Sequence, residues 1–295
     1  MIIVDASMLA FRCWSKMDFL KNSGGVSTGL EFGFLRTLQS LTKCYPDHEV
    51  VVVFDSYHRK KRIDPQYKAN RKPWDDDFSK RFNALKRFLQ ATYRTAASLG
   101  SEADDVMWKI TKLERGPHVV YTNDDDLLQA VDDERDVIVV KSFRSKLYEW
   151  DEAKVREKYG VSPRNLAFLR AFLGDKSDNL PGVGRVNRRL LAALIEWSMD
   201  KHEGDVMNAL REVLSGDWSQ QEQELLNAHV DSGQWGRNLA LMWIAKTERV
   251  HVQYTWPGQD EDYVVEKLNE WEIRTLKICE AYKDRLAEIA ADGEF

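Results

Sequence analysis

Short apolar runs alternate with helical patterns through the first half of the chain. Four runs are rich in β-branched residues and have the length of buried strands: residues 2–4, 50–54, 119–121 and 137–140. Between them, apolar residues recur with the period of a helix at residues 30–41, 78–98 and 106–113. This alternation predicts an α/β fold with a central, mostly parallel sheet flanked by helices.

The strand pattern ends near residue 152, and helical segments bearing Leu, Trp and Arg follow to the end of the chain. A chain of 295 residues can bury one α/β core together with a smaller helical lobe. We therefore predict an α/β core over residues 1–151 and a helical lobe over residues 152–295 that packs on the core.

Composition narrows the class of protein. Hydrophobic residues make up 43% and charged residues 31% of the chain, as in ordinary soluble proteins. No apolar run approaches the roughly 20 residues of a membrane helix, and Asp5 interrupts the apolar start where a signal peptide needs a continuous one. Three widely spaced cysteines fit reduced thiols and lack zinc-type spacing. We expect a cytoplasmic protein in which any metal is held by oxygen.

The net charge of −5 conceals a strongly basic segment. Between residues 57 and 74 the only acid is Asp64, whereas the basic residues are Arg59, Lys60, Lys61, Arg62, Lys68, Arg71 and Lys72. The interleaved rings of Tyr57, Tyr67 and Trp74 favour a nucleic-acid strand, since aromatic rings stack on unpaired bases while cations follow the phosphates. The alternative is a solvated charged face.

Acidic residues directly follow the predicted strands. Asp5 and Asp55 each follow one strand, and Asp124, Asp125 and Asp126 follow another. Because the carboxyl ends of parallel strands meet at one edge of a sheet, these side chains are expected to converge there. Carboxylates in such proximity repel one another unless cations join them.

Two further segments carry acids: Glu102, Asp104 and Asp105 at a helix start, and Asp175 and Asp178 in a turn-forming segment. Each segment alone could serve only as a cap, for example with Ser101 as N-cap and Asp104 as its capping-box partner. Glu102 and Asp105, however, lie on or beside the apolar stripe of the predicted helix, so they are expected to face the interior.

Together the five acidic segments predict a metal site. Oxygen donors without His or Cys favour Mg²⁺ or Mn²⁺ and a phosphate-containing substrate. Two such ions about 3.5–4 Å apart can activate water and stabilise the leaving oxygen in phosphodiester hydrolysis. The six histidines suggest no Ser-His-Asp arrangement that would compete with this prediction.

A Pro-Gly-Val-Gly turn at residues 181–184 leads into a helical pattern at residues 185–197. Backbone N–H groups at such a turn can grip the phosphates of duplex DNA without reading its sequence. An ordinary helix–turn–helix connection is the alternative reading of the same residues.

Taken in order, VDAS, VVVFDS with YKANR, EADD, TNDDDLLQ and GDKSDNLPGVG resemble the motifs of the 5′-nuclease family. This family includes flap endonucleases, the 5′-nuclease domain of bacterial DNA polymerase I, and bacteriophage 5′-exonucleases, and the resemblance is greatest to the last two. It implies a PIN-like sheet with a helical arch at about residues 57–80 and a helix–three-turn–helix element.

The resemblance also implies residue roles. The ligands implied for the catalytic metal are Asp5, Asp55, Glu102, Asp104 and Asp124, and those for a second metal are Asp105, Asp126, Asp175 and Asp178. Lys68 and Arg71 match the residues that contact the reacting phosphate, so they join Asp5, Asp55 and Asp124 as expected catalytic residues. The expected DNA-binding residues are Arg12, Arg59, Lys60, Lys61, Arg62, Tyr67, Lys68, Arg71, Lys72, Gly182, Gly184, Arg185 and Arg188.

The sequence departs from the family pattern at two places. PGVGRVNRRLL is one residue shorter than the usual PGVxGIGxKTA, with Val186 in place of a glycine, which weakens the expectation of the K⁺ that this element often binds. In the other loop, Asn123 replaces the usual glycine and Asp125 the usual lysine, and Asp125 is not assigned to metal.

The function implied is Mg²⁺-dependent cleavage near the 5′ end of flap, nicked or branched DNA, as flap endonuclease and 5′→3′ exonuclease. We expect a monomer that binds DNA with a 5′ single strand, with RNA/DNA hybrids and replication proteins as further candidate partners. GRNLALMWI resembles a segment of phage members, so a phage-encoded enzyme in the host cytoplasm is expected. The alternatives are a PIN-like ribonuclease and a non-catalytic, structure-specific DNA-binding protein.

Overall fold

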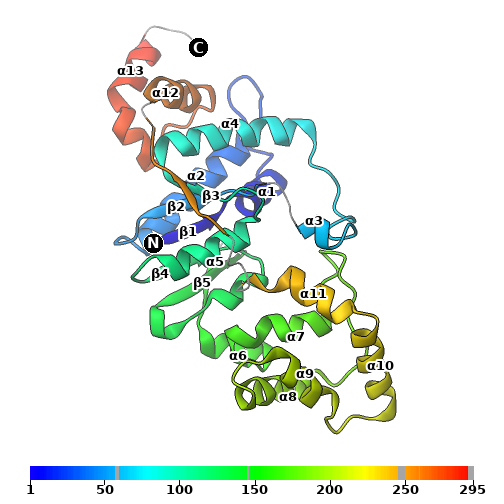
Figure 1. The fold of residues 1–295 in the computed structure, drawn as a ribbon. Coiled ribbons are helices and arrows are strands. Elements are labelled where there is room, and N and C mark those ends of the chain that lie inside the picture. Colours follow the sequence, from blue (N-terminus) through cyan, green and yellow to red (C-terminus); the bar gives the residue numbers. More distant parts are fainter. Residues whose placement is uncertain (57–59, 145, 245–249, 259, 292–295) are drawn as a thin grey trace. The chain divides into compact units, whose positions relative to one another are not determined.

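The computed structural model describes residues 1–56, 60–144, 146–244, 250–258 and 260–291 (Figure 1). The chain forms two compact units that are interleaved along the sequence. Unit 1 contains residues 1–56, 74–98 and 251–295, and unit 2 contains residues 57–73 and 99–250. This division differs from the single expected boundary after residue 151.

Unit 1 is built on four strands: β1 (Ile2–Asp5), β2 (Val50–Val53), β3 (Arg94–Ala97) and β7 (Gln253–Thr255). The pairs β1–β2 and β2–β3 are parallel, and β3–β7 is antiparallel. Every residue of β1 and β2 is buried, as expected for β-branched runs in a sheet covered on both faces. The helices of this unit are α1 (Ala6–Lys16), α2 (Gly29–Cys44), α4 (Asp76–Thr92), α12 (Glu261–Glu270), the 3₁₀ helix η5 (Lys277–Tyr282) and α13 (Lys283–Ala291).

A side-chain cap explains where α1 begins, and a glycine explains how closely α2 packs on α1. Asp5 ends β1 and accepts a hydrogen bond from the Met8 backbone N–H at 2.9 Å, which caps α1. Helix α2 packs on α1 because it presents glycine: a Cβ at Gly29 would lie 1.8 Å from the Met17 carbonyl oxygen. The approach of the two helices therefore depends on glycine at that position.

Unit 2 contains the remaining strands: β4 (His118–Tyr121), β5 (Val137–Phe143) and β6 (Lys146–Trp150). The pair β4–β5 is parallel and β5–β6 is antiparallel. The longer helices of unit 2 are α5 (Ala103–Leu113), α6 (Glu152–Tyr159), α7 (Leu166–Leu173), α8 (Arg188–Lys201), α9 (Val206–Leu214), α10 (Gln220–Asp231) and α11 (Gln234–Met242). The short ones are α3 (Lys60–Ile63) and the 3₁₀ helices η1 (Asp126–Ala130), η2 (Asp133–Arg135) and η3 (Pro163–Asn165).

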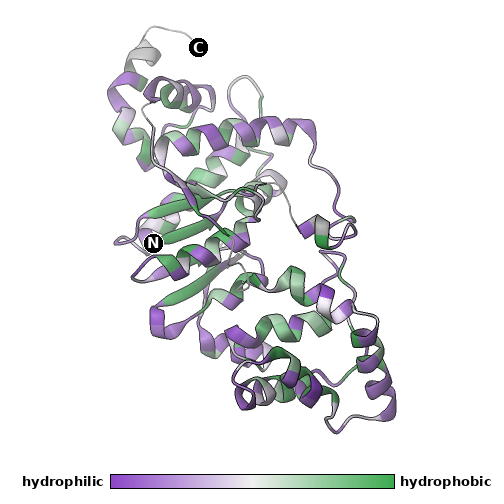
Figure 2. Cartoon of the chain, in the orientation of Figure 1, coloured by the Kyte–Doolittle hydropathy of each residue, from purple (hydrophilic) through white to green (hydrophobic). Residues whose placement is uncertain are grey.

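The predicted fold class is confirmed. Three of the strand pairs within the units are parallel, and helices flank the strands of both units. In Figure 2 the strands are mostly green and the exposed sides of the helices mostly purple, so hydrophobic residues lie inside. None of the described helices combines the length and apolar character needed to cross a membrane.

The predicted helix at residues 78–98 is wrong at its carboxyl end. Helix α4 ends at Thr92, Tyr93 is extended, and the next four residues form β3. Val52 pairs with Thr95 and Val53 with Ala96 in a parallel register. Pairing with a strand about 40 residues earlier overrides the local helical pattern.

Helices dominate the second half of the chain as predicted, but this half also contains a strand. Strand β7 lies within it and pairs antiparallel with β3, with Thr255 opposite Thr95. Only three residues long, this strand is too short for the apolar alternation on which sequence-based strand prediction relies.

Candidate metal and nucleic-acid site

Four buried carboxylates gather among the elements of unit 2. The exposed fractions of Glu102, Asp105, Asp126 and Asp178 are 2%, 6%, 8% and 5%. They come from the start of α5, the start of η1 and the turn after α7. Acidic side chains are rarely this buried unless they are paired or hold a cation, so the surroundings of each one are informative.

The start of α5 carries two of these acids. Glu102 is the N-cap and Asp105 is its capping-box partner, with the Glu102 N–H donating to Asp105 Oδ2 at 3.4 Å. The capping box predicted for Ser101 and Asp104 is found one residue later in the chain. The prediction that the side chains of Glu102 and Asp105 face the interior is confirmed, because both are buried, whereas Asp104 is half-buried.

The basic segment supplies the partners of Glu102. Lys68 Nζ lies 2.7 Å from Glu102 Oε1, and Lys60 Nζ lies 2.8 Å from Oε2. Lys60 also approaches Asp105 Oδ1 at 3.6 Å. Burial is the largest single influence on both ammonium groups and disfavours their charge. Glu102, by its charge and its hydrogen bond, together with the other nearby acids outweighs burial and raises the pKa of Lys60 and of Lys68. Both lysines therefore stay charged beside the carboxylates.

The Tyr67 ring is 3% exposed and packs with Leu180, Leu241 and Met242, and its hydroxyl donates to Glu102 Oε2 at 3.0 Å. The prediction that Tyr67 stacks on bases is thus corrected. An interior position and a carboxylate partner leave the ring no face for a base.

The turn after α7 carries Asp175 and Asp178. Asp175 Oδ1 accepts hydrogen bonds from the Ser177 N–H at 2.7 Å and from Ser177 Oγ at 2.6 Å. Although burial opposes it, these bonds and the nearby Arg170 lower the pKa of Asp175. Asp178 forms an ion pair with Arg71, and its carbonyl accepts from the Lys68 N–H at 2.9 Å. The basic segment is thus fastened to this turn through both backbone and side chain.

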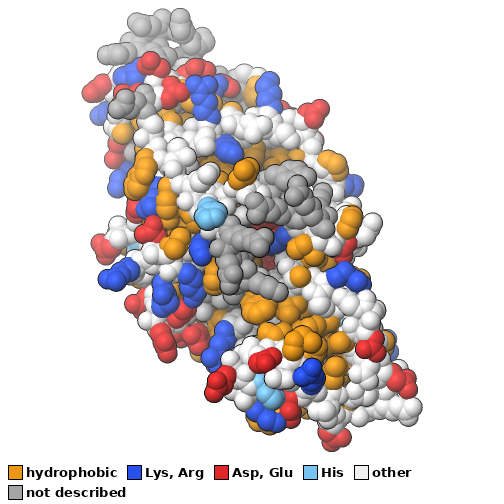
Figure 3. All heavy atoms as spheres, in the orientation of Figure 1, with side chains coloured by type: hydrophobic (Ala, Val, Ile, Leu, Met, Phe, Trp, Pro, Cys, Tyr) orange, Lys and Arg blue, Asp and Glu red, His pale blue; other side chains and the backbone are white. Residues whose placement is uncertain are grey.

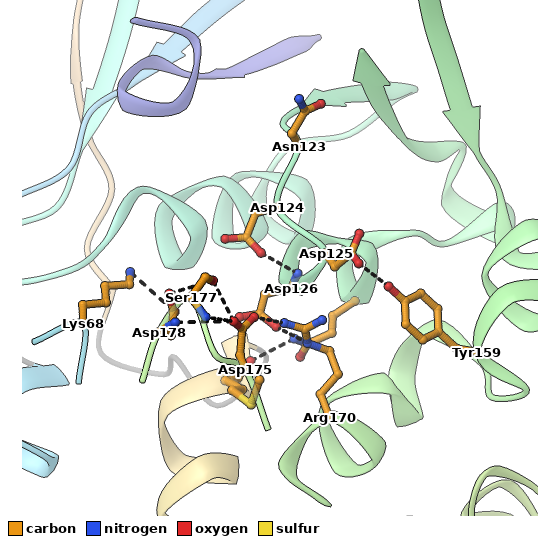
Figure 4. A network of polar contacts seen from close by, with 12 residues as sticks. Lys68, Asn123, Asp124, Asp125, Asp126, Tyr159, Arg170, Asp175, Ser177 and Asp178 are labelled. Atoms are coloured by element: carbon orange, nitrogen blue, oxygen red, sulfur yellow. Dashed lines mark hydrogen bonds and ion pairs between the residues drawn. The ribbon is translucent and has the colours of Figure 1, made fainter. Parts of the chain in front are cut away.

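Arg170 on α7 joins two acidic segments, and sequence reasoning missed it. Its Nε lies 2.7 Å from Asp126 Oδ1, and its Nη2 lies 2.7 Å from Asp175 Oδ2 (Figure 4). Although burial disfavours its charge, Asp126, Asp124 and Asp175 raise the pKa of Arg170. The available signal was an arginine inside the apolar helix LAFLRAFL, because a buried arginine needs an acidic partner.

The loop after β4 presents Asp124 and Asp126. Asp124 Oδ1 accepts from the Asp126 N–H at 2.8 Å, and the Asp124 N–H donates to Thr122 Oγ1 at 3.1 Å. Burial raises the pKa of Asp126, with Arg170 opposing the shift and Asp124 reinforcing it. A cation that replaces the lost hydration would favour the charged form of Asp126.

The Pro-Gly-Val-Gly turn lies on the end of α7. A Cβ at Gly182 would lie 2.0 Å from the Leu173 carbonyl oxygen, so only glycine fits without a shift of the backbone. Gly184 has a φ of +89° and no neighbour within 4 Å of a Cβ, so its role is conformational. The following helix α8 begins at Arg188 and is capped by Asn187, which accepts from the Leu190 N–H at 3.2 Å.

The remaining predicted residues lie elsewhere in the chain. Asp5, Arg12 and Asp55 belong to unit 1, where Asp5 ends β1 and Asp55 lies two residues after β2. Lys72, Arg185 and Arg188 are exposed in unit 2. Arg59 and the side chains of Lys61 and Arg62 lie outside the described part of the chain.

The donor chemistry of unit 2 fits a hard divalent cation. All the candidate ligands are carboxylates, and Asp126 Oδ1 is buried without a hydrogen-bond donor, although Arg170 lies close. As their side chains stand, no group of three His, Cys, Asp or Glu among the described residues is arranged to hold a metal ion. Carboxylates of this set are instead paired with Lys60, Lys68, Arg71 and Arg170.

Parallel strands with carboxylates at their ends, a basic segment fastened to Glu102 and Asp178, and a glycine turn before α8 define a PIN-like α/β protein of the 5′-nuclease class. The model of the family described as 5′-3′ exonuclease, N-terminal resolvase-like domain, matches residues 1–160. The chain therefore belongs to this family, and the predicted membership of the 5′-nuclease family is confirmed.

Two relatives and one solved structure illustrate the similarity. DNA polymerase I of Mycobacterium tuberculosis is 32% identical over 220 residues, which cover 72% of this chain and 24% of the polymerase. The 5′-3′ exonuclease of Buchnera aphidicola is 30% identical over 202 residues, covering 66% of this chain and 69% of that protein. The structure of bacteriophage T5 5′-exonuclease with zinc ions has a TM-score of 0.64 at 21% identity, over 91% of this chain and 98% of that one. The chain spans about a quarter of the polymerase relatives it matches, and the structural likeness concerns the fold.

Proposed function

We propose that the protein is a divalent-metal-dependent, structure-specific 5′ nuclease that hydrolyses phosphodiesters near the 5′ end of flap, nicked or branched DNA. The observation that carries the proposal is the group of buried carboxylates in unit 2 to which the basic segment contributes Lys60, Lys68 and Arg71. Similar folds support it: a flap endonuclease of bacteriophage T5 was solved with DNA and metal ions, and the catalytic core of Rad2 with DNA substrate.

The proposed metal ligands are those implied by the sequence. Within unit 2 these are Glu102, Asp104, Asp105, Asp124, Asp126, Asp175 and Asp178. Asp5 and Asp55, which belong to unit 1, are proposed from the family resemblance alone. We propose Mg²⁺ or Mn²⁺, and two ions, because the donors are all carboxylates and their number exceeds what one octahedral ion takes. When bound, such ions lower the pKa of a bound water and stabilise charge on the phosphate oxygens.

The side chains of the protein itself bind and orient the substrate. Lys68 and Arg71 can exchange their carboxylate partners for oxygens of the scissile phosphate, which offsets its charge. We propose that Arg185 and Arg188, which are exposed, and the backbone of the glycine turn grip the phosphates of a duplex. Arg170 keeps Asp126 and Asp175 near each other.

The test is cleavage of a labelled 5′-flap duplex by the full chain, with Mg²⁺ and with a chelator. We expect cutting only with metal, and a loss of at least about 100-fold in Asp124→Asn, because a ligand charge is removed. The matched control is Asp231→Asn, which changes an exposed acid of α10 and should cut as the unaltered chain does.

Each contrary outcome points to a different protein. Equal cutting in chelator would overturn the metal mechanism. Flap binding without any cutting would indicate a non-catalytic DNA-binding protein. Preference for unpaired RNA over flap DNA would indicate a PIN-like ribonuclease, whereas cutting of both flap DNA and RNA/DNA hybrids would extend the proposal to primer removal.

A further inference from the structure

Asp125 stands between two proposed metal ligands but turns away from them. In Figure 4 its carboxylate faces Tyr159, on the opposite side of the loop from Asp126 and Arg170. Oδ2 accepts from the Tyr159 hydroxyl and lies 3.1 Å from Lys158 Nζ, and both residues belong to α6. Oδ1 forms an ion pair with Lys141 on β5. One carboxylate thus ties the loop to a helix and to a strand.

Lys141 is the central partner in this arrangement. Its side chain is 12% exposed, and its Nζ also donates to the Asp124 carbonyl at 3.1 Å. The next residue of β5, Ser142, makes two hydrogen bonds to the Asn123 side chain. The Ser142 N–H donates to Asn123 Oδ1 at 2.9 Å, and the Ser142 carbonyl accepts from Asn123 Nδ2 at 3.2 Å. The backbone of the loop is therefore held on β5 by two neighbouring residues.

The two lysines around Asp125 are close to the same ring. Lys141 Nζ lies 5.8 Å and Lys158 Nζ lies 5.0 Å from the centroid of Trp150. Two ammonium groups gathered in this way repel each other, and Asp125 is the carboxylate that accepts from both. Asp124 is a further negative charge near enough to act on Lys141.

We propose that Asp125 is a positioning residue, which engages Lys141 and Lys158 so that the Asp124 carboxylate is left available for metal. The inference rests on the proposed metal-dependent function. Without the charge of Asp125, Lys141, whose ammonium group already donates to the Asp124 carbonyl, would turn to the Asp124 carboxylate and compete with the cation.

The test is binding of Mn²⁺ to the full chain without DNA, measured by isothermal titration calorimetry. We expect Asp125→Asn to weaken Mn²⁺ binding on the order of 10-fold, as is usual when a residue behind a metal ligand is removed. Asp125→Asn with Lys141→Met should return to within about 3-fold of the unaltered chain, because the competing ammonium is gone. Lys141→Met alone should also stay within about 3-fold.

Two further measurements separate positioning from general damage. Asp200→Asn removes the acid of an exposed ion pair with Arg164 in the same unit and should leave Mn²⁺ binding unchanged. In the flap assay, Asp125→Asn should raise the Mg²⁺ concentration for half-maximal rate while the rate at saturating Mg²⁺ stays near that of the unaltered chain. Circular dichroism establishes that each variant is folded.

The outcomes are distinguishable. Absence of Mn²⁺ binding by the unaltered chain would overturn the proposed function itself. Normal Mn²⁺ binding by Asp125→Asn would overturn the role of Asp125 alone. Weak binding by the double variant, or by Lys141→Met alone, would overturn the competition between Lys141 and the metal, and it would mean that the loop needs Lys141 for its shape.

Discussion

Replacing Asn238 by leucine should loosen the glycine turn and destabilise unit 2. The Asn238 side chain is fully buried in α11, and its Nδ2 donates to the Ala171 carbonyl at 2.9 Å and to the Pro181 carbonyl at 2.8 Å. One amide thus joins the end of α7 to the residue before Gly182. Its Oδ1 accepts from Gln234 Nε2 at 2.8 Å, so the whole amide is satisfied.

The magnitude follows from the partners that would be left behind. The Ala171 carbonyl keeps a second partner, His229 Nε2 at 3.1 Å. Losing its hydrogen bond from Asn238 therefore costs only the net value of one hydrogen bond, about 1 kcal/mol. For the Pro181 carbonyl no other partner is seen among the described residues, but Pro181 itself is exposed, so the loss of this bond also costs about 1 kcal/mol. Leucine branches at the same atom as asparagine but is larger, so overpacking of this buried site adds to the loss. We expect a loss of at least about 2 kcal/mol in the free energy of unfolding.

Urea denaturation at 25 °C measures this loss, followed by tryptophan fluorescence. Trp235 is a suitable reporter because its buried ring lies 5.1 Å from the Phe168 ring and 5.7 Å from the Phe172 ring. The control is Asn208→Leu on the exposed side of α9, which should change stability by less than about 0.5 kcal/mol. If Asn238→Leu cost no more than this control, the two hydrogen bonds would not hold the turn, and the reasoning would fail.

Three further outcomes are expected. Although burial opposes it, hydrogen bonds from Ser162, Asn165 and Arg156 lower the pKa of Glu196, so Glu196→Gln should cost about 1–3 kcal/mol near pH 7. A carboxylate with a lowered pKa stabilises the fold above its unfolded pKa, so in urea melts this cost should shrink as the pH falls below about 4.5, and an unchanged cost at pH 3 would contradict the assignment. Gly182→Ala should destabilise the protein more than Gly184→Ala, whose left-handed backbone costs about 1–2 kcal/mol, and the reverse order in thermal melts would refute the close contact with Leu173. Burial raises the pKa of Cys13 to about 12, so in the native protein at pH 8 a thiol reagent should modify exposed Cys44 rapidly and leave Cys13 unmodified, as peptide mapping would establish.

The sequence predicts those parts of the fold whose signal is local. Strands β1, β2, β4 and β5 are found because β-branched residues fill each of them, and α5 because its apolar residues share one face. The burial of Glu102 and Asp105 follows from the same stripe. These features can be predicted because each one depends only on the residues of a single strand or helix.

The features that were missed depend on distant partners. Residues 94–97 become β3 because β2 offers a parallel partner, and nothing in the helical pattern before them signals it. Asn238 is an ordinary polar residue in a helix until α7 and the glycine turn meet its amide. The partner of Arg170 could not be named either, since Asp126 lies 44 positions earlier. Strand β3, the contacts of Asn238 and the partner of Arg170 all depend on tertiary contacts, which the local sequence pattern does not reveal.

The basic segment illustrates how pairing changes a prediction made from charge alone. Lys60, Lys68 and Arg71 direct their charges at Glu102 and Asp178, whereas Lys72 is exposed. On the face of each unit shown in Figure 3, the coloured Lys and Arg side chains lie among Asp and Glu side chains. DNA binding should therefore release fewer counterions than the number of basic residues suggests.

The salt dependence of flap DNA binding tests this consequence. Each phosphate contact contributes about 0.9 to the slope of log K against log salt concentration for duplex DNA and about 0.7 for single strands. In chelator, where metal does not compete for the carboxylates, Lys72→Ala should reduce the slope measured by fluorescence anisotropy by about 0.7–0.9. Lys60→Ala should leave the slope unchanged, because that ammonium is already paired with Glu102. An equal reduction in both variants would mean that Lys60 leaves Glu102 for phosphate when DNA binds, and the ion pair would then be a switch between two partners and not a fixed support.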